Sequence, residues 1–250
     1  MLTAGVDLAA ERAGTAVAVV RWSAASARVE DVILPAGDDA VLAAVRAAGK
    51  TGVDCPLGWP DAFVRYVTAH QDGAAETASG DKAWRRGLAW RHTDEIVRAT
   101  VPPIVPLSVA ADKIGHAALR CAHLQSRLAA EGRPVDRSGA GPVVEVYPAA
   151  SLRIWGLPWN GYKGTAQLAA RIELVDQLRA AAPWLDLGAF ADRCVRSDHV
   201  LDAVVAALTA RAAACGLTAG PAPDQLGAAR REGWIALPTV ALDGLMPSPG

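Results

Sequence analysis

Several features are missing from this 250-residue chain, and each absence argues against a class of protein. Its four cysteines (Cys55, Cys121, Cys194 and Cys215) include no C-x-x-C pair, so a zinc site built on cysteines is not expected. No uninterrupted apolar run approaches the roughly 18 residues that a membrane span needs. A P-loop, a G-x-G-x-x-G turn and a G-x-S-x-G elbow are also missing. Scattered cysteines without a signal peptide predict a cytoplasmic protein.

Neither sign of charge dominates the chain. The formal net charge is -1, so no global attraction to nucleic acid or acidic membranes is expected. Hydrophobic residues make up 52% of the sequence, which is enough to bury a large core. No repeat or linker divides the chain. We therefore expect a single domain over residues 1–250, with a helical and loop insertion at about 61–140 whose longest helix covers residues 107–131.

The N-terminal stretch has the pattern of a β-hairpin that carries an acid. Residues 2–7 and 15–22 are apolar runs on either side of a turn at Ala13-Gly14. Residues 28–34 predict a third strand, and an Ala-rich helix follows. Asp7 lies near the end of the first strand, where a buried sheet can hold its carboxylate still. The alternative is that Asp7 only caps a turn through its own backbone.

A second acid ends a second apolar run. Residues 51–54 read as a short strand that stops at Asp54, before Pro56, Gly58 and Pro60. The order of strands, helix and strand predicts an α/β layer in which this fourth strand is parallel to the first. Asp54 would then lie beside Asp7, at the sheet edge where α/β proteins bind their ligands.

The segment from Trp84 to Asp94 concentrates three arginines and two tryptophans. If it faced a cleft, its arginines would bind phosphates and its indoles would stack on rings. The alternative is a surface segment with extended arginines and two buried indoles. Arg91 and Asp94 precede a helical run, and we take them as candidate substrate-binding residues. Lys163, in Tyr-Lys-Gly, is a third candidate because it could meet a substrate phosphate.

Glu145 interrupts an otherwise apolar strand over residues 142–148. A carboxylate inside such a run is costly to bury without a partner or a metal ion. The alternative is an edge strand that leaves Glu145 in solvent.

Asp198 and Asp202 stand four residues apart at the start of an apolar helix, so both lie on one face of its first turns. Two like charges there repel each other unless a cation lies near them. The alternative is an N-cap followed by a second acid that the helix dipole favours. We interpret His199 as a mere neighbour of these acids.

Five acids therefore form the candidate catalytic set: Asp7, Asp54, Glu145, Asp198 and Asp202. Four of them are candidate metal ligands: Asp7, Asp54, Asp198 and Asp202. Clustered carboxylates without soft ligands suit Mg²⁺ or Mn²⁺. Two such ions roughly 4 Å apart would activate a water molecule and stabilise the leaving oxygen in phosphodiester hydrolysis. The expected partner is a nucleic acid or nucleotide substrate, and no membrane.

A series of motifs runs in order over nearly the whole chain. They are Gly5-Val-Asp7-Leu-Ala, Gly52-Val-Asp54-Cys-Pro-Leu-Gly-Trp-Pro, Arg91-His-Thr-Asp94, residues 108–115, residues 144–152, Tyr162-Lys-Gly, residues 198–211 and Glu232-Gly-Trp-Ile. Together they resemble the DUF429 family, which is described as a predicted nuclease with a ribonuclease H-like fold. The resemblance implies a mixed five-stranded sheet in the order 3-2-1-4-5, with the first three strands antiparallel, flanked by helices. It also implies metal-binding acids on the first strand, the fourth strand and a late helix, which are the places of Asp7, Asp54 and Asp198/Asp202.

The sequence leaves three functions open. The first is a Mg²⁺- or Mn²⁺-dependent nuclease or related phosphodiesterase. The second is a binding or regulatory protein that keeps the acids as a structural cation site. The third is an actin-like phosphotransferase, because that fold begins with a similar Asp-bearing hairpin. This chain is short for the third function and shows neither a second domain nor a second glycine-rich phosphate loop.

Overall fold

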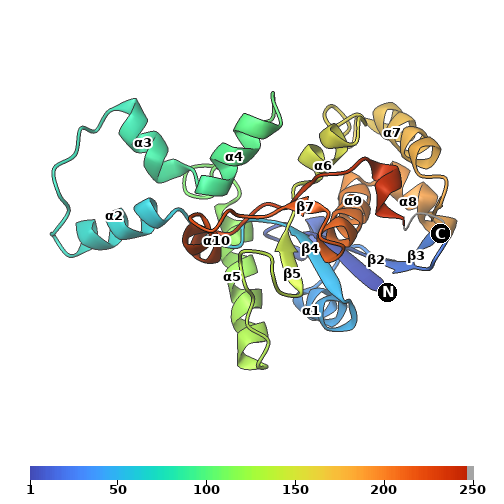
Figure 1. Ribbon diagram of the computed structural model, residues 1–250, viewed down its shortest axis with the longest axis horizontal. Coiled ribbons are helices and arrows are strands. Elements are labelled where there is room, and N and C mark those ends of the chain that lie inside the picture. The colour runs from blue at the N-terminus through green and yellow to red at the C-terminus, as the bar shows by residue number, and fades with distance from the viewer. Residues whose placement is uncertain (247–250) are drawn as a thin grey trace.

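A six-stranded mixed sheet in the order β5-β4-β1-β2-β3-β6 organises the computed structural model, which describes residues 1–246 (Figure 1). The last four residues of the predicted domain lie outside the described residues. The strands are β1 (Leu2–Asp7), β2 (Ala16–Trp22), β3 (Ala27–Ile33), β4 (Lys50–Asp54), β5 (Val143–Glu145) and β6 (Leu185–Asp186), and a separate pair joins β7 (Thr218–Ala219) to β8 (Leu237–Pro238).

The helices are α1 (Asp38–Ala47), α2 (Asp61–Gln71), α3 (Lys82–Ala89), α4 (His92–Thr100), α5 (Gly115–Ala130), α6 (Pro148–Ile154), α7 (Leu168–Ala181), α8 (Ala191–Arg196), α9 (Asp198–Ala214) and α10 (Leu226–Glu232). Short 3-10 helices cover Arg12–Gly14, Gly188–Phe190 and Leu242–Leu245. These elements confirm the predicted α/β class.

The strand pairing confirms the predicted directions but corrects the predicted strand count and order. β1, β2 and β3 are antiparallel neighbours, and β4 and β5 continue the sheet in parallel to β1. A sixth strand, β6, pairs in parallel with the outer edge of β3, so the sheet does not end there. β6 has only two residues, and a run that short has no periodicity from which a strand could be predicted.

Helices cover both faces of the sheet and form two main cores. On one face, α9 packs over β1, β2 and β4, and α7 and α8 pack beside it. On the other face, α1 and α5 bury Val6 and Val53 from the centre of the sheet. Because α9 is mostly apolar and has buried residues along nearly its whole length, it suits the central, enclosed position. In residues 1–246, no helix is both long and apolar enough to cross a membrane.

Two glycines allow α9 to approach the sheet closely. Gly5 and Gly52 are direct partners in the β1–β4 ladder. A Cβ atom on Gly5 would lie 2.0 Å from the carbonyl oxygen of Ala203, and one on Gly52 would lie 2.5 Å from that of Ala206. Side chains two residues apart share a face of a strand, so Asp7 and Asp54, two residues after these glycines, are on the α9 side. The repeated Gly-Val-Asp sequence thus brings the helix and two acids together.

We expect Gly5→Ala to lower the free energy of unfolding by about 3 kcal/mol, because the new methyl group would force α9 away from the sheet. Urea denaturation would measure the change. Gly87→Ala is the matched control, since a Cβ atom there meets nothing within 4 Å. Equal stability of the two variants would contradict this account of the helix–sheet contact.

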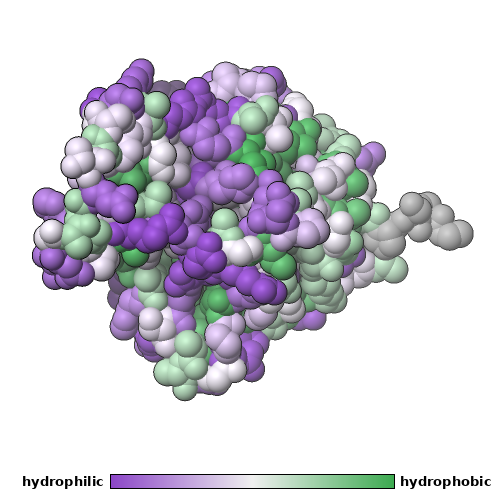
Figure 2. Space-filling view, turned by 60° about the vertical axis from the view of Figure 1, so that its left-hand side comes forward, coloured by the Kyte–Doolittle hydropathy of each residue, from purple (hydrophilic) through white to green (hydrophobic). Residues whose placement is uncertain are grey.

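The segment at 61–140 contains α2, α3, α4 and α5. α2 and α3 extend away from the sheet as an arm (Figure 1), and neither has a buried residue. Figure 2 is turned so that the side of the molecule with α2 and α3 comes forward, and hydrophilic residues cover much of the surface in that view. The predicted helix over 107–131 was wrong at its start, since α5 begins at Gly115. Ser108 Oγ instead accepts from the backbone nitrogens of Ala110 and Ala111, and Asp112 accepts from that of Ser108, so residues 108–112 form turns.

Candidate functional site

Three carboxylates from three elements meet at the carboxyl edge of β1 and β4. Asp7 and Asp54 end these strands and are paired in register, as predicted. Asp202 reaches them from the second turn of α9. One oxygen of each acid lies within 4.8 Å of an oxygen of the other two, so the three could hold a metal ion. We call Asp7, Asp54 and Asp202 the acid cluster.

The acid cluster is electrostatically unfavourable without a cation. Burial raises the pKa of Asp54 well above its usual range; Lys163 opposes the shift, and the negative charges of Asp7 and Asp202 add to it. Burial also raises the pKa of Asp202, again against Lys163. Among residues 1–246, none donates a hydrogen bond to the Asp54 carboxylate. Lys163 offsets only part of this cost, so a bound cation would supply further balancing charge to Asp54.

Lys163 and its neighbour Tyr162 hold the third acid of the cluster. Lys163 Nζ lies 2.7 Å from Asp202 Oδ2, and the Tyr162 hydroxyl donates to Asp202 Oδ1 at 2.7 Å. The Lys163 side chain is 55% exposed, whereas that of Asp202 is 2% exposed. The predicted substrate-binding lysine thus reaches the acid cluster from its solvent side.

Asp198, a predicted metal ligand, lies outside the acid cluster. Its Oδ2 accepts a hydrogen bond of 2.7 Å from the backbone nitrogen of Gly164. Ser197 is the N-cap and accepts from Val200. Although Asp198 and Asp202 share a helix face, they are separated by about 6 Å along the axis. That rise leaves Asp198 beside the 162–164 segment rather than beside β1.

His199 is a residue of the site that the sequence analysis missed. Its Nδ1 lies 2.6 Å from Asp7 Oδ2. This hydrogen bond raises the pKa of His199. The available signal was spacing, because His199 is three residues before Asp202 and therefore on a neighbouring part of the same helix face. A partner of this kind orients a carboxylate and leaves its other oxygen free.

The other predicted site residues form a second, buried group. Arg91 Nη2 lies 2.8 Å from Asp94 Oδ1 and 2.7 Å from Glu145 Oε1, and Arg91 Nη1 donates to Glu145 Oε2 at 2.8 Å. Leu57 adds a backbone donor to Glu145 at 3.0 Å. All three charged side chains are at most 3% exposed. We call Arg91, Asp94 and Glu145 the buried triad; its donors and acceptors largely satisfy one another.

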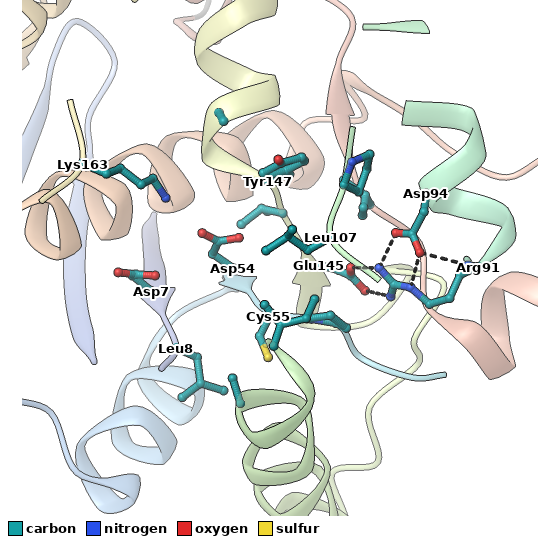
Figure 3. A pocket seen from close by; sticks show the side chains of 17 residues that line it. Asp7, Leu8, Asp54, Cys55, Arg91, Asp94, Leu107, Glu145, Tyr147 and Lys163 are labelled. Atoms are coloured by element: carbon teal, nitrogen blue, oxygen red, sulfur yellow. Dashed lines mark hydrogen bonds and ion pairs between the residues drawn. The ribbon is translucent and has the colours of Figure 1, made fainter. Parts of the chain in front are cut away.

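One cavity connects the two groups. It has a volume of about 380 Å³, and Asp7, Asp54 and Lys163 line one side of it. The buried triad lies on the opposite side, as Figure 3 shows. Leu107, Tyr147 and other apolar side chains form the walls between them. A ligand at the acid cluster would therefore extend over an apolar surface toward a group whose charged side chains are already paired with one another.

The arginines and tryptophans of the 84–94 segment do not act as one unit. Arg86 pairs with Glu95 at 2.8 Å and lies over the Trp90 ring, and Arg85 donates to the carbonyl of Gly80. Trp84 packs edge-on against Tyr66 of α2. The Trp84–Tyr66 contact joins α3 to α2, and the Arg86–Glu95 pair joins α3 to α4. Only Arg91 and Asp94 reach the cavity.

Comparison with known proteins gives one match. The profile of a family described as "Protein of unknown function (DUF429)" matches residues 5–226. No curated protein and no solved structure matches the chain.

Proposed function

The chain belongs to the DUF429 family, and we propose that it is a Mg²⁺- or Mn²⁺-dependent phosphodiesterase of ribonuclease H-like architecture. The acid cluster carries this proposal: two acids at the ends of adjacent parallel strands and one on a packed helix, all within 4.8 Å. The strand sequence β3-β2-β1-β4-β5 within the larger sheet supports the ribonuclease H-like assignment.

The donor set fits a hard divalent cation. All three groups of the acid cluster are carboxylates, and oxygen ligands are those that Mg²⁺ and Mn²⁺ prefer. Within residues 1–246 no group donates a hydrogen bond to Asp54, so its oxygens are available to an ion. When bound, such an ion would supply Lewis-acid stabilisation of phosphoryl oxygens and would lower the pKa of a water molecule.

The chain's own residues orient the ligands and bind the substrate. His199 fixes Asp7, and Tyr162 fixes Asp202. Lys163 faces the cavity and is the side chain placed to contact a phosphate oxygen. Arg91 is engaged with Asp94 and Glu145, so its part is to shape the cavity rather than to bind phosphate. The apolar walls suit the uncharged part of a phosphodiester substrate.

A titration of Mn²⁺ into the wild-type protein, followed by calorimetry, tests the proposal. The same samples are assayed on single-stranded, duplex and hybrid nucleic acids and on bis(p-nitrophenyl) phosphate. We expect wild-type protein to bind Mn²⁺ and cleave a phosphodiester, and Asp7→Asn to lose both. Asp176→Asn, an exposed position on α7, is the control.

Binding without cleavage of any substrate would instead support a binding or regulatory protein with a structural cation. Equal binding heats in wild-type protein and Asp7→Asn would remove Asp7 from the ligand set and overturn the proposal.

A further inference from the structure

Lys163 brings a positive charge into contact with the acid cluster. Its Nζ lies 2.7 Å from Asp202 Oδ2, and Asp202 belongs to the acid cluster. We infer that the site takes one divalent cation per chain and that the Lys163 ammonium group serves as its second positive centre. The inference rests on the proposed metal-dependent function but differs from the two-ion scheme considered for the sequence.

Charge balance supports a single ion. The three ionised carboxylates of the acid cluster carry three negative charges, and Lys163 returns one positive charge. The two that remain are balanced by one divalent cation. A second divalent cation beside Lys163 would leave excess positive charge next to Asp202, which is buried, and uncompensated charge in such a place is costly. His199 Nδ1 lies 2.6 Å from Asp7 Oδ2 and adds no negative charge to the acid cluster.

The segment that carries Lys163 is fixed by a buried arginine. Arg171, 2% exposed, donates to the carbonyl oxygens of Tyr162 at 2.8 Å, Gly164 at 2.5 Å and Val195 at 2.8 Å. Among residues 1–246, no ion pair joins Arg171 to a carboxylate, so its donors serve the main chain alone. The same segment is tied to α9 through Asp198 and Asp202.

These contacts fix the residues on either side of Lys163, Tyr162 and Gly164. The Lys163 side chain itself is partly exposed and lines the cavity. With a divalent ion held by the acid cluster, the partly exposed Lys163 ammonium group would be available to bind a non-bridging oxygen of a phosphoryl group. The ligand class is therefore a phosphoester that contacts one metal ion and one lysine.

The number of Mn²⁺ ions per chain tests the inference. Calorimetric titration and electron paramagnetic resonance would be carried out on wild-type protein, Lys163→Met and Lys163→Gln. We expect one ion in wild-type protein. In both variants the freed Asp202 oxygen and the lost positive charge should admit a second ion, which gives two per chain and the spectrum of an exchange-coupled Mn²⁺ pair.

Lys163→Arg, which keeps the charge, and Lys82→Met, at an exposed position of α3, should each retain one ion. Two ions in wild-type protein would overturn the inference and leave the proposed function standing. A count of one ion in folded Lys163→Met and Lys163→Gln would also overturn the inference and leave the proposed function standing. Absence of Mn²⁺ binding in wild-type protein would overturn the proposed function as well.

Discussion

Replacing Arg91 with methionine is expected to lower the free energy of unfolding by about 3 to 5 kcal/mol, because it leaves the carboxylates of Asp94 and Glu145 buried without their counter-ion. The guanidinium group makes charged contacts of 2.7–2.8 Å with both acids. It also donates to the carbonyl oxygen of Glu232, which links the C-terminal segment to this group. Urea denaturation followed by circular dichroism would measure the loss.

A triple variant separates charge burial from loss of packing. Combining Arg91→Met with Asp94→Asn and Glu145→Gln removes the unpaired charges, so it should recover part of the lost stability. Arg196→Met is the matched control, because Arg196 and its partner Asp192 are both largely exposed and such pairs contribute little. If the triple variant is no more stable than Arg91→Met alone, unpaired buried charge is not the cause.

The part of the site that depends on strand register could be predicted from the sequence. Asp7 and Asp54 each end a short apolar strand, and a parallel arrangement of those strands places them side by side. The sequence predicted Asp198 and Asp202 together as acids near this edge, because their spacing puts them on one face of a helix. The spacing does not tell which of the two turns lies against the sheet. The close approach permitted by Gly5 and Gly52 decides that question in the folded protein.

Contacts between distant segments could not be predicted. Glu145 was recognised as a costly buried acid, but its partner Arg91 lies 54 residues earlier in the sequence, and no local pattern connects the two. The same limit applies to β6, since its two residues acquire strand structure only by pairing with Ala27 and Arg28. A metal ligand and a structural ion pair therefore present the same signal in the sequence, an acid at the end of an apolar run.

Asp54 of the acid cluster differs from the acids of the buried triad, because no group within residues 1–246 donates a hydrogen bond to its carboxylate. Burial raises the pKa of Asp54, so the folded protein favours its protonated form. Asp54 in the unfolded chain loses its proton near the ordinary aspartate pKa of 3.8, whereas in the folded protein it loses its proton only at a higher pH. The free energy of unfolding therefore falls as the pH rises from 3.8 through the raised pKa. Without metal, the Asp54 carboxylate should destabilise the fold at neutral and alkaline pH, and this effect should vanish in acid.

We therefore expect Asp54→Asn to raise the melting temperature of the metal-free protein at neutral pH and to abolish its stabilisation by Mn²⁺. The same substitution should lower phosphodiester cleavage by about a thousandfold, since a metal ion supplies several kcal/mol of transition-state stabilisation. Differential scanning calorimetry with and without Mn²⁺, together with the cleavage assay, would measure both effects, with Asp176→Asn as the control. A lower melting temperature in the metal-free Asp54→Asn protein would mean that the wild-type carboxylate is already stabilised by the protein. In that case the acid cluster would be a second structural ion-pair group rather than a site for a cation.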